Sequence, residues 1–137
     1  MMAPAFHVAQ ETAVWPPPPP LRELLLDADP DERQVADHLA HGELYVARSR
    51  GAAAGAIVIR QTGEDTWEIM NCSVAPEYRR HGCGTALVLH ALHIIRNKGA
   101  RYAELGTCDA SPGPMALYES CGFRISGVVK NHFTDNY

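Results

Sequence analysis

The chain has 137 residues and a mass of 15.0 kDa, with a net charge of −4, an apolar fraction of 46% and a charged fraction of 20%. These proportions exclude disorder throughout, and the length predicts one domain over residues 1–137 with a single core. The acidic balance, with a pI near 5.9, argues against a nucleic-acid partner. No uncharged apolar run approaches the roughly 18 residues of a membrane span, and the first ten residues do not form a secretory signal. We therefore expect no membrane partner and a cytoplasmic location.

The N-terminal part of the chain predicts one short strand and then two helices. Residues 6–10 have the length of a strand. The proline run at 16–20 excludes helix interior and central strand, so it indicates an extended spacer; docking of an SH3-like partner is the less favoured alternative. Residues 21–26 then indicate a short helix. Asp29 before Pro30 is typical of a helix start with a capping carboxylate, and that helix is expected to end at Gly42.

From residue 43 the apolar pattern becomes that of strands. Runs at 44–47, 56–59 and 67–74 are predicted strands, with turns at 51–55 and 61–65. A long helix is expected over 84–98, where Leu87, Ala91, Ile94 and Ile95 share one face. Three further elements follow: a strand at 101–106, a short helix at 114–120 and a last strand at 124–129. This order predicts an α+β fold with three layers, α/β/α, around a mixed and mostly antiparallel central sheet.

The segment between the third of these strands and the long helix indicates a phosphate site. A helix N-terminus carries unpaired N–H groups and the positive end of the helix dipole. Gly82 and Gly84 stand at this point, so the backbone can approach a ligand closely. Arg79 and Arg80 add positive charge, and His81 lies within the turn, where it could help hold a phosphate. A tight connection with solvated arginines is the alternative interpretation.

Two motifs resemble the GCN5-related N-acetyltransferase (GNAT) family. Arg79-x-x-Gly82-x-Gly84 resembles the acyl-CoA-binding signature of that family, and ALYESCGF at 116–123 resembles its end segment. The resemblance extends over about residues 6–129 in the element order of the family. It implies the GNAT-like acyl-CoA N-acyltransferase fold, and transfer of an acetyl group from acetyl-CoA to a primary amine.

The resemblance also implies which residues hold the cosubstrate. The backbone of Cys72 and Val74 would pair with the pantetheine arm, and the backbone of the glycine-rich turn would wrap the pyrophosphate. Asp109 takes a position where similar sequences often carry asparagine, and its charge would repel the pyrophosphate unless the side chain turns away. The expected cofactor-binding residues are Cys72, Val74, Arg79, Arg80, His81, Gly82, Cys83, Gly84, Thr85 and Asp109.

N-acetylation requires a base, because an alkylammonium group has a pKa of about 10.4 and its deprotonation at pH 7 costs about 4–5 kcal/mol. Glu68 is the expected base, since it lies on the strand that leads to the phosphate site, fourteen residues before Gly82. That spacing resembles the base of the histone-acetylating branch. A solvated strand glutamate is the alternative. By strand alternation Glu68 would share a face with Met70 and Cys72, with Asn71 opposite as a polar support for substrate.

Tyr118 is the acid that the resemblance implies. It would lie near the thioester sulfur and protonate the departing thiolate, whereas a purely packing role for the ring is the alternative. No cysteine has a histidine partner in its sequence context, so direct attack in a ternary complex is favoured over a covalent cysteine route. The alternative function, from a different class, is a non-catalytic acyl-CoA-binding or interaction module, since fold does not fix function.

We expect no metal, because the four cysteines form no CxxC motif and are expected to be reduced and packed. The histidine pairs at 38/41 and 90/93 are expected on helix surfaces, with no third ligand nearby. The expected partner is a small-molecule or peptide amine acceptor. Only about a dozen residues follow Ile125, too few for the seventh strand that the family usually has. The sheet edge would then stay open, be filled by a second copy in a homodimer, or be completed beyond Tyr137.

Overall fold

The computed structural model describes residues 5–105 and 129–132. The elements in chain order are β1 (His7–Glu11), α1 (Pro19–Ala28), α2 (Glu32–His41), β2 (Gly42–Ser49), β3 (Ala52–Gln61), β4 (Thr66–Val74), the 3₁₀ turn η1 (Pro76–Tyr78), α3 (Cys83–Asn97), β5 (Tyr102–Leu105) and β6 (Val129–His132). The predicted helix at 114–120 and residues 124–128 of the predicted last strand lie outside the described residues. Within the described ranges, no helix has the length and apolar character needed to cross a membrane.

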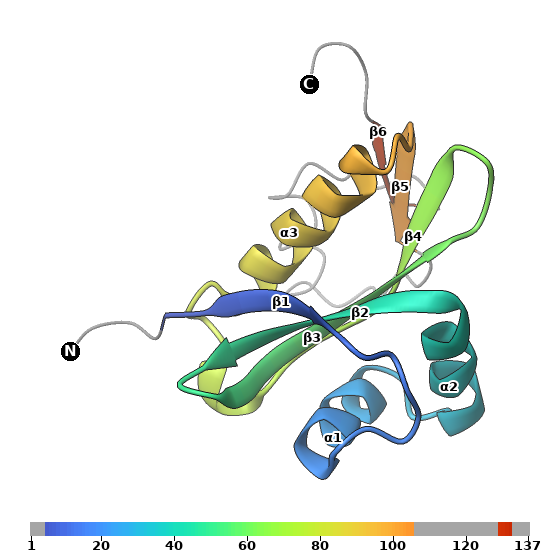
Figure 1. The fold of residues 1–137 in the computed structure, drawn as a ribbon. Helices are drawn as coiled ribbons and strands as arrows, with labels where there is room; N and C mark the ends of the chain where they lie inside the picture. The colour runs from blue at the N-terminus through green and yellow to red at the C-terminus, as the bar shows by residue number, and fades with distance from the viewer. Residues whose placement is uncertain (1–4, 106–128, 133–137) are drawn as a thin grey trace.

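The six strands form one sheet whose spatial order equals the chain order, β1 to β6. Every neighbouring pair is antiparallel except β4 and β5, which are parallel. Helix α3 makes the crossover connection between those two strands (Figure 1). The predicted mixed and mostly antiparallel sheet is therefore confirmed.

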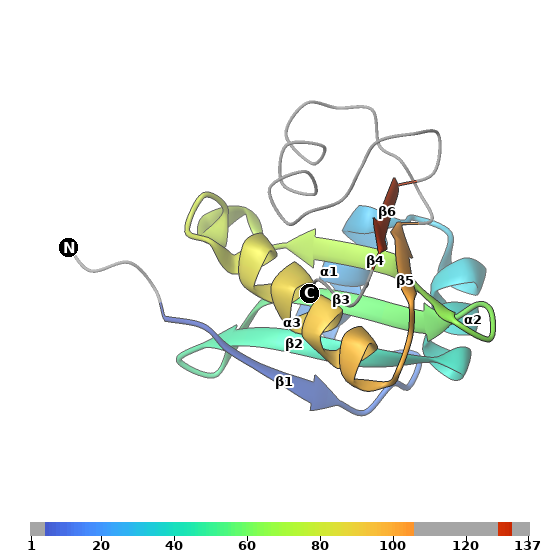
Figure 2. The same ribbon diagram turned by 90° about the horizontal axis from the view of Figure 1, so that it is seen from above.

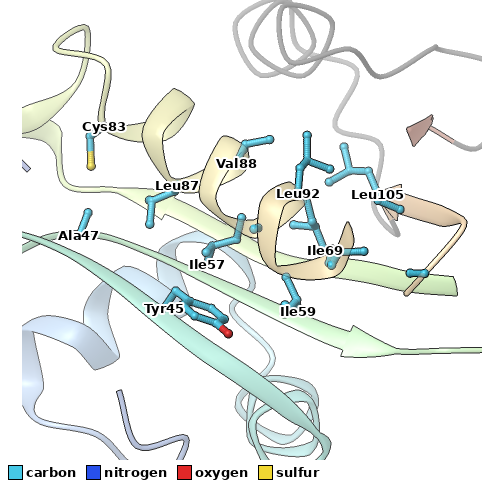
Figure 3. Close-up of a cluster of buried hydrophobic side chains, with 14 of the residues drawn as sticks. Tyr45, Ala47, Ile57, Ile59, Ile69, Cys83, Leu87, Val88, Leu92 and Leu105 are labelled. Carbon is cyan, nitrogen blue, oxygen red and sulfur yellow. The ribbon is translucent and has the colours of Figure 1, made fainter. Parts of the chain in front are cut away.

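Helices cover both faces of the sheet, which confirms the three predicted layers (Figures 1 and 2). Helix α3 packs on one face through a set of residues that we call the α3-side cluster: side chains from β2 to β5 and α3 such as Ile57, Ile59, Ile69, Leu87 and Ile95. In Figure 3, Cys83 and Leu87 of α3 point toward Ala47 and Ile57 on the strands. Helices α1 and α2 cover the other face through a second cluster that includes Leu25, Leu39 and Val58. The two faces thus meet different helices, and each has its own core.

The starts of the two N-terminal helices differ from the sequence prediction. Helix α1 begins inside the proline run, with Pro19 and Pro20 in its first turn, where a missing N–H costs nothing. Helix α2 is capped by Asp31, whose carboxylate accepts hydrogen bonds from the N–H groups of Arg33 and Gln34. The predicted cap, Asp29, instead accepts from the N–H of Asp31 in the connecting turn. The helix end at Gly42 is as predicted.

The turn between β2 and β3 is shorter than the predicted turn at 51–55. It consists of Arg50–Gly51, both with positive φ, at +52° and +83°. This two-residue turn matches the twist of the flanking strands. Gly55, which we predicted within the turn, lies in β3. A Cβ at Gly55 would stand 2.9 Å from both Leu87 Cδ1 and the Ser73 carbonyl oxygen, so this glycine serves close packing of β3 against β4 and α3.

Candidate cofactor and acceptor site

The N-terminus of α3 has the backbone geometry of an anion site. Gly82 caps the helix with φ +85°, in the left-handed region, and a Cβ built there would meet nothing within 4 Å. Among the described residues no side chain caps this helix end, so its first N–H groups have no side-chain acceptor there. Arg80 also has a positive φ, +65°, which costs a non-glycine residue roughly 1 kcal/mol. Strained backbone beside an uncapped helix end is typical of a ligand cradle.

Two side chains of this turn, Arg79 and Cys83, make contacts away from the helix end. Arg79 donates from Nε to the Val74 carbonyl at 3.2 Å and from a terminal nitrogen to Asp27 of α1, also at 3.2 Å. Cys83 is buried in the α3-side cluster, and burial raises the pKa of its thiol to about 11. Arg80 and His81 are exposed, while Gly84 and Thr85 are half-buried in the first turn of α3.

Strand β4 leads to this turn and extends past the described end of β5. Its pairing with β5 stops at Ile69 opposite Leu105. The described part of β5 ends there, whereas Asn71 to Val74 continue β4 and are paired to β3. Cys72 and Val74 are part of this segment, and their side chains pack against the α3-side cluster.

A β-bulge at Met70 corrects the predicted arrangement of β4. In the register with β3, Val58 faces Asn71 and Ile59 faces Ile69, so Met70 is an extra residue without a β3 partner. The bulge shifts the alternation by one position. Before it Trp67 and Ile69 contact the α3-side cluster, and after it Cys72 and Val74 do. The prediction that Glu68 shares a face with Cys72, opposite Asn71, is therefore wrong.

Glu68 and Asn71 are instead neighbours on the face that α1 and α2 cover. Their β3 partners, Arg60 and Val58, are two residues apart and so lie on one face. Asn71 is 6% exposed and donates from its side-chain nitrogen to the Leu25 carbonyl of α1 at 3.0 Å. Its side-chain oxygen has no hydrogen-bond partner within the described part of the chain. Asn71 thus anchors α1 and retains one unused acceptor.

The surroundings of Glu68 make its carboxylate a better base than a solvated one. Burial raises the pKa of Glu68, and the Glu104 carboxylate on β5 raises it further, while the Arg60 guanidinium acts in the opposite direction. Glu104 stands directly across from Glu68 in the β4–β5 register, and Arg60 directly across in the β3–β4 register. The carboxylate is half-buried beside a second negative charge, an arrangement suited to accept a proton.

Sequence reasoning missed a polar cluster between α2 and β3. Arg60 donates to the Asp37 carboxylate at 2.9 Å and lies 3.4 Å from Nδ1 of His38. His38 is only 7% exposed, so the prediction that it lies on a helix surface is wrong. Its ring packs under α2 because the apolar stripe of that helix includes its position. The sequence feature that could have indicated this cluster is Arg60, a single arginine near the end of an otherwise apolar strand.

Two predicted site residues, Tyr118 and Asp109, lie outside the described residues. The remaining ones divide between the two faces of the sheet, with the glycine-rich turn on the α3 side and Glu68 on the α1/α2 side. Across residues 5–105 and 129–132, no group of three or more His, Cys, Asp or Glu side chains is placed to hold a metal ion.

The family model described as "Acetyltransferase (GNAT) family" matches residues 7–123. The chain belongs to this family. It is 37% identical to the uncharacterized N-acetyltransferase YvbK of Bacillus subtilis over 117 residues, 85% of this chain and 76% of that protein. An acetyltransferase of B. subtilis solved in complex with CoA is 34% identical, with a TM-score of 0.82 over 89% of this chain and 78% of that one. A GNAT acetyltransferase of Elizabethkingia anophelis with acetyl-CoA bound is 32% identical, with a TM-score of 0.79 over 88% and 77%. The GNAT acyl-CoA N-acyltransferase fold predicted from the two motifs is confirmed.

Proposed function

We propose that this GNAT chain transfers an acetyl group from acetyl-CoA to a primary amine by direct attack in a ternary complex. One observation carries this proposal. Strand β4 leads from a half-buried carboxylate with a raised pKa, Glu68, to the uncapped helix end at Gly82. A proton acceptor and an anion cradle at the two ends of one strand are what an acyl transfer from an acyl-CoA to an amine needs.

Acetyl-CoA supplies a thioester whose carbonyl carbon an amine can attack. The cradle fits its pyrophosphate, because Gly82 leaves open space and the N–H groups of α3 are uncapped. The residues proposed to hold it by their backbone are Arg79 to Thr85. As the family resemblance implies, the backbone of Cys72 and Val74 on β4 would pair with the pantetheine amides. Acetyl-CoA-bound and CoA-bound neighbours support this assignment.

Glu68 takes the amine proton, directly or through water. An alkylammonium group loses its proton with difficulty at neutral pH, and a carboxylate with a raised pKa reduces the gap between donor and acceptor. Glu104 contributes a second negative charge beside it, so the face attracts a cationic acceptor. The acceptor proposed here is therefore a primary alkylamine, either a small molecule or a peptide amine.

Tyr118 is the proposed acid for the departing thiolate, on the strength of its place in the ALYESCGF segment. A covalent cysteine route is disfavoured by the state of Cys83. Its thiol is buried in the α3-side cluster and has a pKa of about 11, so it is a poor nucleophile at neutral pH. Direct attack needs no such nucleophile.

The test is release of CoA thiol from acetyl-CoA across a panel of amines, with the acetylated product identified by mass. The panel contains polyamines, amino acids, peptides with free N-termini, lysine peptides and aromatic amines. We expect turnover with at least one alkylamine and none with aromatic amines, which are uncharged at neutral pH. Tight acetyl-CoA binding by calorimetry without thiol release for any amine would instead indicate a non-catalytic acyl-CoA-binding module.

A further inference from the structure

Arg60 and Glu68 form an unusual cross-strand pair. They stand directly opposite each other in the β3–β4 register, where opposite charges ordinarily come into contact. Among the ion pairs that the described residues form, however, Arg60 joins Asp37 of α2 at 2.9 Å and does not join Glu68. The guanidinium is thus drawn from the strand toward the helix layer.

Two side chains of α2 hold the guanidinium there. Asp37 accepts a hydrogen bond from Arg60 at 2.9 Å, and Nδ1 of His38 lies 3.4 Å from the same terminal nitrogen. Because arginine only donates, His38 must accept at Nδ1 and carry its proton on Nε2. Burial and the Arg60 charge lower the pKa of His38, so the ring is neutral at pH 7 and suited to this role. Asp37 supplies the charge, and His38 supplies a second acceptor.

Arg60 is the cation directly opposite Glu68 in the strand register of the described sheet. Helix α1 presents the buried leucines Leu21, Leu24 and Leu25 to this face. On β5 the facing group is Glu104, another carboxylate, and its register partner on β6 is Lys130. On α2, Nδ1 of His41 lies 3.3 Å from the Asp37 carboxylate, on the exposed side of the helix. Arg60 is one strand away from Glu68 in the register and Lys130 is two strands away, so a change in the position of Arg60 has the more direct effect on Glu68.

We propose that Asp37 is a positioning residue for the acceptor site: with His38 it holds Arg60 on α2, prevents an Arg60–Glu68 ion pair, and so leaves the Glu68 carboxylate open to a cationic amine. The inference rests on the proposed function in that Glu68 is the group that receives the amine. An arginine paired with Glu68 would occupy the carboxylate oxygens and weaken it as a base, because a close opposite charge lowers the pKa of a carboxyl by about 1–3 units. Asp37 lies on the far side of Arg60 and needs no contact with substrate.

The experiment compares Asp37→Ala, Arg60→Met and the double variant with wild type, by a carbon-13 NMR titration of the Glu68 carboxyl. The Glu68 signal is assigned from its absence in Glu68→Gln. In Asp37→Ala the released guanidinium turns to Glu68, and the titration midpoint of Glu68 falls by about one pH unit. In Arg60→Met the cation is gone, and the midpoint rises by about half a unit or more. Glu32→Ala, which removes the same charge from an exposed position of the same helix, should leave the midpoint unchanged.

The double variant distinguishes an effect of Asp37 that acts through Arg60 from a direct electrostatic effect of the Asp37 charge on Glu68. If Asp37 acts through Arg60, the double variant has the raised midpoint of Arg60→Met, and the effect of Asp37→Ala disappears. A fall of equal size in both backgrounds, or no shift in Asp37→Ala, overturns the inference. Circular dichroism checks that the variants fold, and Asp37→Glu should restore the wild-type midpoint because it keeps a carboxylate that reaches Arg60.

A kinetic measurement separates this inference from the proposed function. Where the chain turns over an alkylamine, the acid limb of the kcat/KM profile should move with the NMR midpoint, down in Asp37→Ala and up in Arg60→Met. Midpoints that move as stated in a chain without acetyl transfer overturn the proposed function alone. Turnover with unmoved midpoints overturns the positioning role alone.

Discussion

The two faces of the sheet are built in different ways. The α3 side, with the proposed acetyl-CoA cradle, depends on backbone: a helix end without a side-chain cap and Gly82 with φ +85°. The α1/α2 side, with the proposed acceptor site, depends on side chains that come from four elements, namely Asp37, Arg60, Glu68 and Glu104. Backbone recognises what all acyl-CoA substrates share, whereas side chains can differ with the acceptor.

This difference predicts which substitutions impair each side of the sheet. A cradle made of backbone is insensitive to most side-chain changes and is broken by an added Cβ at a critical glycine. A face made of charges is instead tuned in small steps, because each substitution alters a pKa or a hydrogen bond.

Gly82→Val should abolish acetyl-CoA binding. A branched side chain at φ +85° fills the open space in front of the α3 N-terminus and blocks approach of the pyrophosphate to the backbone. We expect calorimetric affinity to fall by at least about 100-fold, or 2.7 kcal/mol. Gly99→Val is the matched control, since Gly99 has φ +83° and equally open surroundings at the other end of α3. Equal affinities in the two folded variants would exclude the cradle.

Tyr118→Phe should lower turnover and leave binding intact. The substitution keeps the ring and removes the hydroxyl that would protonate the thiolate. A positioned acid contributes about 10²–10⁴-fold, so we expect kcat to fall by at least about tenfold while acetyl-CoA affinity stays within about threefold. Tyr45→Phe removes a hydroxyl bonded to Glu43 on the α3 side and should leave kcat unchanged. Wild-type turnover in Tyr118→Phe would assign the ring to packing.

Glu68→Gln should produce a loss of activity that depends on pH. The pKa of Glu68 is raised by burial and by Glu104, so the base is ionised only above that raised value and wild-type kcat/KM climbs as pH increases through it. The variant lacks this step and should be impaired most near neutral pH. Its deficit should shrink toward pH 10, where the free amine needs no base. Parallel pH profiles for variant and wild type would remove Glu68 from the mechanism, and the exposed Glu64→Gln serves as the control.

The same contrast explains what the sequence could and could not predict. The cradle, the helix after it and the order of elements follow from local patterns, namely consecutive residues at 79–84 and an apolar stripe at 87–95. The apolar pattern of the sequence does not reveal the bulge at Met70. The residues before and after it, Ile69 and Asn71, are both buried, although they lie on opposite faces of the sheet. Alternation therefore assigned Glu68 and Asn71 to opposite faces. The link from Asp37 to Arg60 spans 23 positions and depends on the packing of α2 on β3, which no local spacing specifies.

The smallest effect concerns the start of α2, where sequence pattern and structure name different caps. Asp31 accepts from the N–H groups of Arg33 at 3.0 Å and Gln34 at 3.3 Å, so Asp31→Ala leaves two helix donors to water. We expect a loss of about 1 kcal/mol in the free energy of unfolding, measured in urea. Asp29→Ala removes one turn hydrogen bond, to the N–H of Asp31, and no helix cap, so its cost should be less than half as large. Both aspartates precede the same helix and carry the same charge, so helix-dipole effects nearly cancel in the comparison. A larger loss in Asp29→Ala would mean that the cap lies at Asp29, as the Asp29-Pro30 pattern predicted, and that α2 begins at Pro30.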